Sequence, residues 1–206
     1  MKFTKSQLDA IGHGDTNLQL IACAGSGKTE VVAQRVANLL KAGLKPANII
    51  AFTFTDKAAA ELKDRIVTRC REAMGDVYGL AEMYVGTIHG FCLDLLMTEV
   101  HDALKFNVLN EVQQTLFIDR HSKASGLTTC TDLKGALLRR YHDTNHYLSA
   151  LNIMREDETD AKALAASPLP AALDTYQALL NDRCYFDYSE ILSRAVVELT
   201  TNKGLR

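Results

Sequence analysis

The sequence lacks any long apolar run. Charged side chains interrupt its hydrophobic stretches well before the roughly 20 residues that a membrane-spanning helix requires. Residues 1–5 do not lead into an apolar signal region either. We therefore expect a globular protein with no membrane segment and no export signal, located in the cytoplasm.

An excess of one charge is also missing. The 206 residues carry 23 Lys and Arg against 25 Asp and Glu, for a formal net charge of −2. A basic surface is the usual electrostatic sign of a nucleic-acid-binding domain, but a groove can be locally positive on a neutral protein. Composition therefore neither supports nor excludes a nucleic-acid partner.

Paired cysteines are absent as well. The five cysteines are odd in number and widely spaced, which argues against a disulfide framework or a zinc site and favours reduced thiols. His142 and His146 have the spacing of two zinc ligands on a helix. No glutamate follows His142 and no third ligand lies nearby, so we favour an exposed polar helix face.

The first hundred residues contain three apolar runs, each followed by an amphipathic helix. The runs are residues 18–22, 48–55 and 83–87, and glycines at positions 43 and 75 end the first two helices. This alternation predicts an α/β fold with a parallel sheet flanked by helices. The residues expected on the buried helix faces are Val32, Val36, Leu39 and Leu40; Leu62, Ile66, Cys70 and Ala73; and Phe91, Cys92, Leu95 and Leu96.

Residues 104–183 show helical patterns without a strand signal. Asn110 and Gln113 form a capping-box pattern, and Ser167 before Pro168 is typical of a helix start. A last helix is expected to begin at Asp187, with Glu190 as its box partner and Ile191, Ala195 and Leu199 facing inward. The architecture therefore changes near residue 104 to an all-helical segment.

The strongest chemical signal is a phosphate loop between the first apolar run and its helix. Polyphosphate requires converging backbone N–H groups, a helix N-terminus and a cation. Gly25 and Gly27 permit close backbone approach, Lys28 is expected to reach the β- and γ-phosphates of ATP, and the Thr29 hydroxyl to bind Mg²⁺. The loop comprises Ala22, Cys23, Ala24, Gly25, Ser26, Gly27, Lys28 and Thr29.

The loop alone does not identify the class of nucleotide-binding protein. The usual pattern begins with glycine, and Ala22 stands there in this chain, a departure that costs little if the backbone there does not need a positive φ. A glycine-rich turn that caps a helix and binds nothing is the alternative to a phosphate site. Kinases, GTPases, transporters and helicases all carry such loops.

Three further segments narrow the class by resemblance. Residues 3–11, 51–62 and 86–92 resemble, in order and spacing, the Q motif, motif Ia and the Thr-Phe-His-Ser-Phe-Cys segment of the UvrD/Rep-type superfamily 1 DNA helicases. Residues 185–192 resemble the Phe-Asp-Asp-Leu helix that returns the chain from a helical insertion to the motor domain in that family. The specific resemblance covers residues 3–96 and 185–199.

The resemblance implies roles for individual residues. Gln7 is expected to read the adenine edge, which a side-chain amide can match because it both donates and accepts hydrogen bonds. Phe54 and Thr55 are expected to contact a base and a phosphate of single-stranded DNA, and Thr87 and His89 to meet the DNA backbone. By residue type alone, Phe54 would be a core aromatic and a lone histidine would be structural.

One position departs from motif Ia. The family has asparagine where this chain has Asp56, whose carboxylate would repel phosphate, so we expect Asp56 to cap the following helix instead.

The implied architecture is a P-loop NTPase (RecA-like) fold with an all-helical inserted subdomain. Residues 1–103 are expected to form the first part of the RecA-like ATP-binding domain, residues 104–184 the insertion, and residues 185–206 the return helix. The Asp-Glu-x-x-Asp segment of the family (Walker B), whose carboxylates hold Mg²⁺ and position water, does not occur before the chain ends at Arg206. We therefore expect weak ATP binding and hydrolysis near background from this chain alone.

The expected function is that of a longer protein. The resemblance implies an ATP-dependent helicase that binds ATP, Mg²⁺, single-stranded DNA and a duplex junction, moves 3′ to 5′, and acts in DNA repair, replication or recombination. Two alternatives stay open: a standalone ATP-binding regulatory module, and the front part of an AddA/RecB-like helicase–nuclease.

Overall fold

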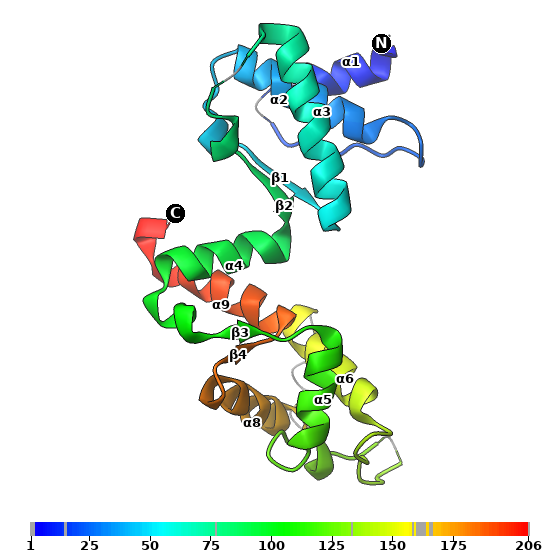
Figure 1. Ribbon diagram of the computed structural model, residues 1–206. Coiled ribbons are helices and arrows are strands. Elements are labelled where there is room, and N and C mark those ends of the chain that lie inside the picture. The colour runs from blue at the N-terminus through cyan, green and yellow to red at the C-terminus, as the bar shows by residue number, and fades with distance from the viewer. Residues whose placement is uncertain are drawn as a thin grey trace. The chain divides into compact units, whose positions relative to one another are not determined.

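The computed structural model describes residues 3–14, 16–76, 78–132, 134–157, 159, 164 and 167–205. The chain divides into two compact units, residues 1–91 and residues 92–206 (Figure 1). Each unit has its own hydrophobic core, and each is described by itself.

The first unit is built around two parallel strands. β1 (Ile50–Thr53) pairs with β2 (Tyr84–Thr87) in a register that joins Ile50 to Tyr84 and Thr53 to Thr87. The connection is the long helix α3 (Asp56–Met74), which ends at Gly75 with a φ of 78°. The parallel pairing of these two runs confirms that part of the sequence prediction.

Two more helices complete the first unit. α2 (Lys28–Lys41) packs against α3, and the short α1 (Lys5–Ile11) packs against α2. Short 3₁₀ turns, Pro46–Asn48 and Leu80–Glu82, precede the two strands. The core consists of Ala33, Val36, Ala37, Leu40, Ile49, Leu62, Ile66, Cys70 and Val85.

The strand expected at residues 18–22 is not present in the described structure. A strand forms only where a neighbour satisfies its backbone N–H and C=O groups. No described strand pairs with this segment, which is irregular and exposes Leu18, Leu20 and, at 89% exposure, Ile21. The prediction of three consecutive sheet strands was wrong in this respect.

The buried face of α2 also differs from the prediction. Val36 and Leu40 are buried as expected, but Val32 is exposed and Leu39 is only partly buried. The helix is apolar on more than one side, and Val32 and Leu39 line an open cavity beside β1. Apolar spacing alone does not distinguish a buried side of such a helix from a side that lines a cavity.

Three aromatic rings hold the two strands to the helix that follows them. Phe52, Tyr84 and Phe91 make edge-to-face contacts with centroid distances of 5.1 to 6.1 Å. Gly86 lies under the Tyr84 ring, because a Cβ atom there would approach the Tyr84 hydroxyl to 2.5 Å. The same hydroxyl donates to the Thr87 carbonyl oxygen at 3.0 Å.

The second unit is mainly helical. α4 (Ile88–Glu99) begins in the first unit and continues into the second, and a 3₁₀ turn (His101–Lys105) follows it. The other helices are α5 (Glu111–Arg120), a 3₁₀ turn (Leu127–Thr129), α6 (Thr144–Glu156), α8 (Leu169–Asp182), α9 (Tyr188–Thr201) and a 3₁₀ turn (Lys203–Leu205). Their core contains Leu109, Ile118, Leu127, Cys130, Tyr147, Leu148, Leu151, Ala172, Tyr176 and Leu180.

A two-residue parallel pair also lies in the second unit. β3 (Asn107–Val108) runs beside β4 (Tyr185–Phe186), with Asn107 N–H donating to the Cys184 carbonyl oxygen at 2.9 Å. The segment predicted to be without strands therefore contains one at its start. A two-residue strand with a partner far along the chain leaves no periodic signal.

The helix starts of the second unit largely follow the sequence signals. The Asn110–Gln113 capping box is present, and Asp187 caps α9 by accepting from Glu190 N–H. The Glu190 side chain does not complete a box but accepts from Gln177 Nε2 at 2.9 Å. Pro168 occupies the N-cap of α8, and the Ser167 hydroxyl accepts from Leu169 N–H.

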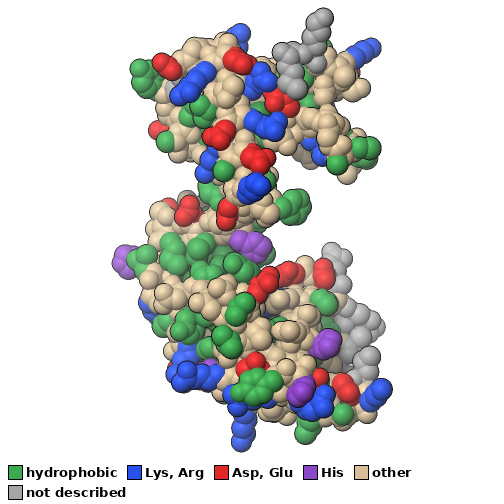
Figure 2. All heavy atoms as spheres, turned by 45° about the vertical axis from the view of Figure 1, so that its right-hand side comes forward, with side chains coloured by type: hydrophobic (Ala, Val, Ile, Leu, Met, Phe, Trp, Pro, Cys, Tyr) green, Lys and Arg blue, Asp and Glu red, His purple; other side chains and the backbone are tan. Residues whose placement is uncertain are grey.

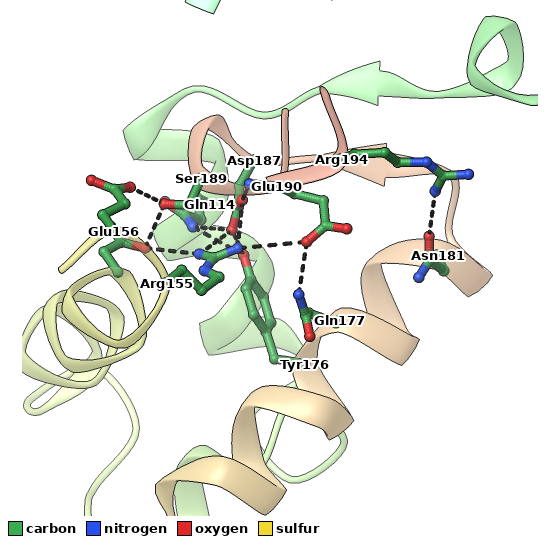
Figure 3. A network of polar contacts seen from close by, with 11 residues as sticks. Gln114, Arg155, Glu156, Tyr176, Gln177, Asn181, Asp187, Ser189, Glu190 and Arg194 are labelled. Carbon is green, nitrogen blue, oxygen red and sulfur yellow. Dashed lines mark hydrogen bonds and ion pairs between the residues drawn. The ribbon is translucent and has the colours of Figure 1, made fainter. Parts of the chain in front are cut away.

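A buried polar network joins α5, α6 and α8 to the start of α9 (Figure 3). Arg155, 3% exposed, makes a bidentate ion pair with Asp187, 1% exposed, at 2.9 and 2.8 Å. The Asp187 carboxylate also accepts from the Tyr176 hydroxyl and from Gln114 Nε2. Burial and the Asp187 charge raise the pKa of Tyr176, so this hydroxyl stays protonated and serves as a donor.

Two absences apply to the described residues. None of their helices is long and apolar enough to cross a bilayer. No group of three or more potential metal-binding side chains occurs among them, and His142 lies before the start of α6, so it does not share a helix face with His146. The surface of the second unit nevertheless shows hydrophobic side chains gathered near α4 and α9 (Figure 2), and α9 exposes Val196 and Val197.

Candidate nucleotide-binding and nucleic-acid-binding site

The phosphate loop has the backbone geometry that its glycines predict. Gly25 and Gly27 have φ values of 76° and 83°, in the left-handed region that favours glycine. Gly27 is the N-cap of α2, and no side chain caps this helix. The N–H groups of its first turn therefore lack a side-chain acceptor, as an anion-binding helix start requires.

Lys28 lies over the loop. Its Nζ atom donates to the carbonyl oxygens of Ala22 and Cys23 at 2.8 and 2.7 Å. The ammonium group is thus held beside the loop backbone by two weak, replaceable partners, where it can exchange a carbonyl oxygen for a phosphate oxygen. Cys23, Ala24 and Ser26 are exposed along the same loop.

Gln7 is attached directly to the phosphate loop. Its Nε2 atom donates to the carbonyl oxygen of Ser26 at 3.0 Å, although the two residues are 19 positions apart. Its Oε1 atom accepts from Thr4 N–H at 2.8 Å in the capping box of α1. One Nε2 proton and one Oε1 lone pair stay available for a ligand.

Arg35 fixes α1 against α2, a role that the sequence analysis missed. Its guanidinium donates to the carbonyl oxygens at the end of α1 and beyond, those of Ala10, Ile11, His13 and Gly14, at 2.6 to 3.4 Å. These carbonyl groups form the negative end of the helix, which a cation stabilises. Arg35 thereby holds the helix that carries Gln7 to the helix that follows the loop.

A buried ion pair, also missed, fixes α2 to α3. Glu30, 6% exposed, directly follows Thr29 and accepts from Arg69 Nε and from Arg65 Nη1. The hydrogen bond to Glu30 raises the pKa of Arg69. A glutamate beside a phosphate loop gives no signal of burial in the sequence, because its arginine partners lie 35 and 39 residues away.

Two cavities adjoin the loop. One of about 310 Å³ is lined by Thr4, Gln7, Ile21, Ser26 and Lys28 among others. The second, of about 580 Å³, lies between α2 and β1, and both Lys28 and Thr29 line it together with Thr53 and Phe54. The structure therefore brings Gln7 and the phosphate loop together on one side, and Thr29 and the end of β1 together on the other.

The two parallel strands end in equivalent threonine caps. Thr55 Oγ1 accepts from Ala58 N–H at 3.2 Å, and Thr87 Oγ1 accepts from Gly90 N–H at 3.1 Å. Each hydroxyl still has a proton to donate, and each lies at the N-terminus of a helix. Because Thr53 and Thr87 are register partners, both caps lie at the same edge of the sheet.

The remaining candidate residues lie at the same edge. Phe54 is 102% exposed, so the alternative of a core aromatic is wrong. Thr55 is the N-cap of α3 and Asp56 is its first helical residue, so the expectation that Asp56 caps the helix is also wrong. His89 is partly buried in the first turn of α4 and has an interaction within the protein.

The family model described as "UvrD/REP helicase N-terminal domain" matches residues 3–206. Among curated proteins, the chain is 37% identical over 127 residues to "DNA helicase II" of Escherichia coli (strain K12), covering 59% of this chain and 16% of that protein. It is 30% identical over 209 residues to "ATP-dependent DNA helicase UvrD1" of Mycobacterium tuberculosis (strain ATCC 25618 / H37Rv), covering 94% of this chain.

A third relative has a different name. The chain is 33% identical over 108 residues to an ATP-dependent helicase/nuclease of Enterococcus faecalis (strain ATCC 700802 / V583), covering 46% of this chain. The chain spans between 8% and 25% of the lengths of these three relatives.

Proposed function

The chain belongs to the UvrD/REP helicase N-terminal domain family, and from this premise we propose that it is the ATP-binding portion of an ATP-dependent DNA helicase. In the whole protein, ATP hydrolysis would drive translocation on single-stranded DNA, 3′ to 5′, and duplex unwinding at a junction during DNA repair, replication or recombination. The names of three relatives, two helicases and a helicase/nuclease, support this class.

The hydrogen bond from Gln7 to the Ser26 carbonyl is the observation that carries the proposal. An adenine-reading amide and a phosphate-binding loop must be held at a fixed separation if both are to contact one nucleotide. Gln7 provides the amide for the adenine edge, and the 22–29 loop with Lys28 provides the donors for the phosphates. Thr29, exposed at the start of α2, provides a hydroxyl for the Mg²⁺ ion that accompanies ATP.

The DNA-binding part of the proposal uses the edge where β1 and β2 end. The exposed Phe54 ring is suited to stack on a base, and the Thr55 and Thr87 hydroxyls at two helix N-termini are suited to donate to phosphate oxygens. His89, in the first turn of α4, supplies a further polar group to the backbone. Thr29 and Phe54 line one cavity, which gives nucleotide and DNA a short physical connection.

The domain organisation and the activity of the isolated chain complete the proposal. Residues 1–103 form the ATP-binding part, residues 104–184 an inserted helical subdomain, and residues 185–206 the return to the motor domain. No Asp-Glu-x-x-Asp segment occurs in the 206 residues. Because such carboxylates position the attacking water, the isolated chain binds ATP weakly and hydrolyses it near the background rate.

A helicase–nuclease is the second candidate, supported by the similarity to the helicase/nuclease of Enterococcus faecalis. Both candidates share the motor activity, and only the second adds a nuclease activity to it. A standalone ATP-binding regulatory module is the alternative without a motor.

Nucleotide and single-strand binding by this chain, beside a form extended through the residues that follow it in the gene, tests the proposal. The motor predicts that the extended form binds ATP more tightly and that single-stranded DNA stimulates its hydrolysis. Equal ATP binding by both forms, with no response to DNA in either, contradicts a helicase and leaves the regulatory module.

A further inference from the structure

The second unit contains a large cavity at some distance in sequence from all the helicase motifs of the first unit. Its volume is about 810 Å³, and it lies between α5, β3 and the turn that joins α8 to β4. The side chains that decide its chemistry are Phe117, Arg120, His121, Arg183 and Tyr185. The proposed motor chemistry leaves all five without a role.

Two arginines and a histidine provide the charge of this cavity. Arg120 is the last residue of α5, His121 is its C-cap, and Arg183 is the C-cap of α8. Burial, then the charges of Arg183 and Arg120, lower the pKa of His121 from its ordinary value of 6.5. Both arginines therefore act on the same imidazole, and the imidazole is neutral at pH 7.

The net charge of the cavity is small and positive. Arg183 is paired with the exposed Asp182 carboxylate at 3.2 Å. Arg120 is exposed and has no ion pair with any residue that the structure describes. With His121 neutral, one unit of positive charge remains, which matches the single negative charge of a phosphodiester better than the multiple charges of a free triphosphate.

Aromatic rings form the wall next to these cations. Phe117 meets Tyr185 edge to face at a centroid distance of 5.6 Å and lies 5.0 Å from the His121 ring. All three rings are only partly buried and line the cavity. Cations beside partly open aromatic rings are the combination by which proteins hold single-stranded nucleic acid, the cations on the phosphate and the rings on the base.

We propose that this cavity binds one nucleotide unit of a single-stranded nucleic acid, with its phosphate between Arg120 and Arg183 and its base against Phe117 and Tyr185. The choice of a strand rests on the proposed function, whereas the recognition of a phosphate and a base does not. A free mononucleotide has the same recognisable groups. The exposed positions of both arginines favour the strand, because a polymer can continue past them into solvent.

The test uses the 206-residue chain and a thymidine oligonucleotide as the probe. Replacing both pocket arginines by glutamine (Arg120→Gln with Arg183→Gln) removes their charge at exposed positions. We expect oligonucleotide binding to weaken about tenfold and the slope of log K against log salt to fall by about 0.7, the value for one neutralised phosphate on a single strand. Arg140→Gln, an exposed arginine of the same unit that does not line the cavity, is the matched control and leaves both quantities unchanged.

A second readout identifies the cavity as the binding place. The oligonucleotide phosphate offsets the arginine charges, so the pKa of His121, followed by NMR, rises on binding. Loss of binding in the Arg140→Gln control to the same extent, or an unchanged pKa of His121 at saturation, overturns the proposal. Thymidine monophosphate that binds as tightly as the oligonucleotide and produces the same shift overturns the choice of a strand.

Failure here and failure of the proposed motor are distinguishable. Lys28→Ala is expected to remove ATP binding and to leave the His121 response to oligonucleotide intact, because Lys28 belongs to the other unit. A chain that binds ATP through Lys28 but shows no His121 response keeps the motor and loses this site.

Discussion

Gln7 donates a hydrogen bond from its side-chain amide to the backbone carbonyl oxygen of Ser26 at 3.0 Å. Through this contact the short helix α1 and the phosphate loop act as one structural element. A Cβ atom on Gly27 would lie 3.1 Å from the same amide nitrogen, so the loop is tightly packed against Gln7. The position of the adenine-reading group is thereby tied to the phosphate-binding groups.

Gln7→Ala is expected to weaken ATP binding about tenfold and to reduce the preference for ATP over GTP. The substitution removes the adenine contact and the attachment of α1 to the loop, and hydrogen bonds of this kind contribute roughly 0.5–1.5 kcal/mol each. Isothermal titration with both nucleotides measures the effect. Gln34→Ala, on the solvent side of α2, is the control. An unchanged ATP to GTP ratio in Gln7→Ala contradicts the adenine role.

The cysteines are expected to react with a thiol reagent at very different rates. Cys23 is exposed in the phosphate loop, whereas burial raises the pKa of Cys70, Cys92 and Cys130. Because the thiolate is the reactive form, Cys23 should react first at pH 8. Mg·ATP should slow this phase, and Cys23→Ser should abolish it. A fast phase that ATP does not affect argues against phosphate binding at the loop.

Phe54→Ala is expected to weaken binding of a thymidine oligonucleotide without lowering the free energy of unfolding. The ring is fully exposed, so it adds nothing to the core, and stacking on one base is worth about 1–3 kcal/mol. Fluorescence anisotropy and urea denaturation give the two quantities. Phe52→Ala, which removes a ring that contacts both Tyr84 and Phe91, should instead destabilise the chain. Equal oligonucleotide affinity in Phe54→Ala and wild type contradicts the DNA contact.

Arg155→Ala is expected to lower the free energy of unfolding of the second unit by about 3–5 kcal/mol. The substitution leaves the Asp187 carboxylate buried without its cation, and Asp187 also caps α9. Arg139→Ala, which removes an exposed partner of Asp143, should have little effect. Urea denaturation of both variants measures the difference. Similar small losses in the two variants would show that the network contributes no more than a surface pair.

Below neutral pH, protonation of His121 should make the folded chain less stable. The folded-state pKa is lowered from 6.5, so both states are neutral well above that value and His121 has no effect there. As the pH falls through 6.5, the unfolded chain takes up the proton before the folded chain, and the free energy of unfolding decreases until the folded-state pKa is passed. His121→Gln should show a smaller loss between pH 8 and pH 5.5 in urea denaturation. An equal loss in both proteins contradicts the shift.

Local signals predicted the parts of the structure that local interactions determine. The end of α3 at Gly75, the Asn110 capping box and the Asp187 cap were predictable because each depends on residues within four positions. The left-handed glycines of the phosphate loop follow from the same kind of reasoning. The parallel pairing of β1 with β2 was predictable because strands joined by a helix usually run parallel.

Contacts between distant residues were not predictable from this one sequence. Glu30 with Arg69, and Arg155 with Asp187, are charged pairs whose residue types usually lie at the surface. The strand expected at residues 18–22 shows the opposite error, because an apolar run becomes a strand only with a neighbour to pair with.

NMR observation of the backbone amides during titration with Mg·ATP tests the central claim most directly, because it detects even weak binding. We predict shifts of Gly25, Gly27 and Lys28 and of the Gln7 side-chain amide, larger with ATP than with GTP, and their loss in Lys28→Ala. Amides of the loop that do not respond to millimolar Mg·ATP, or that respond equally in Lys28→Ala, would contradict the assignment of this chain as an ATP-binding portion of a helicase.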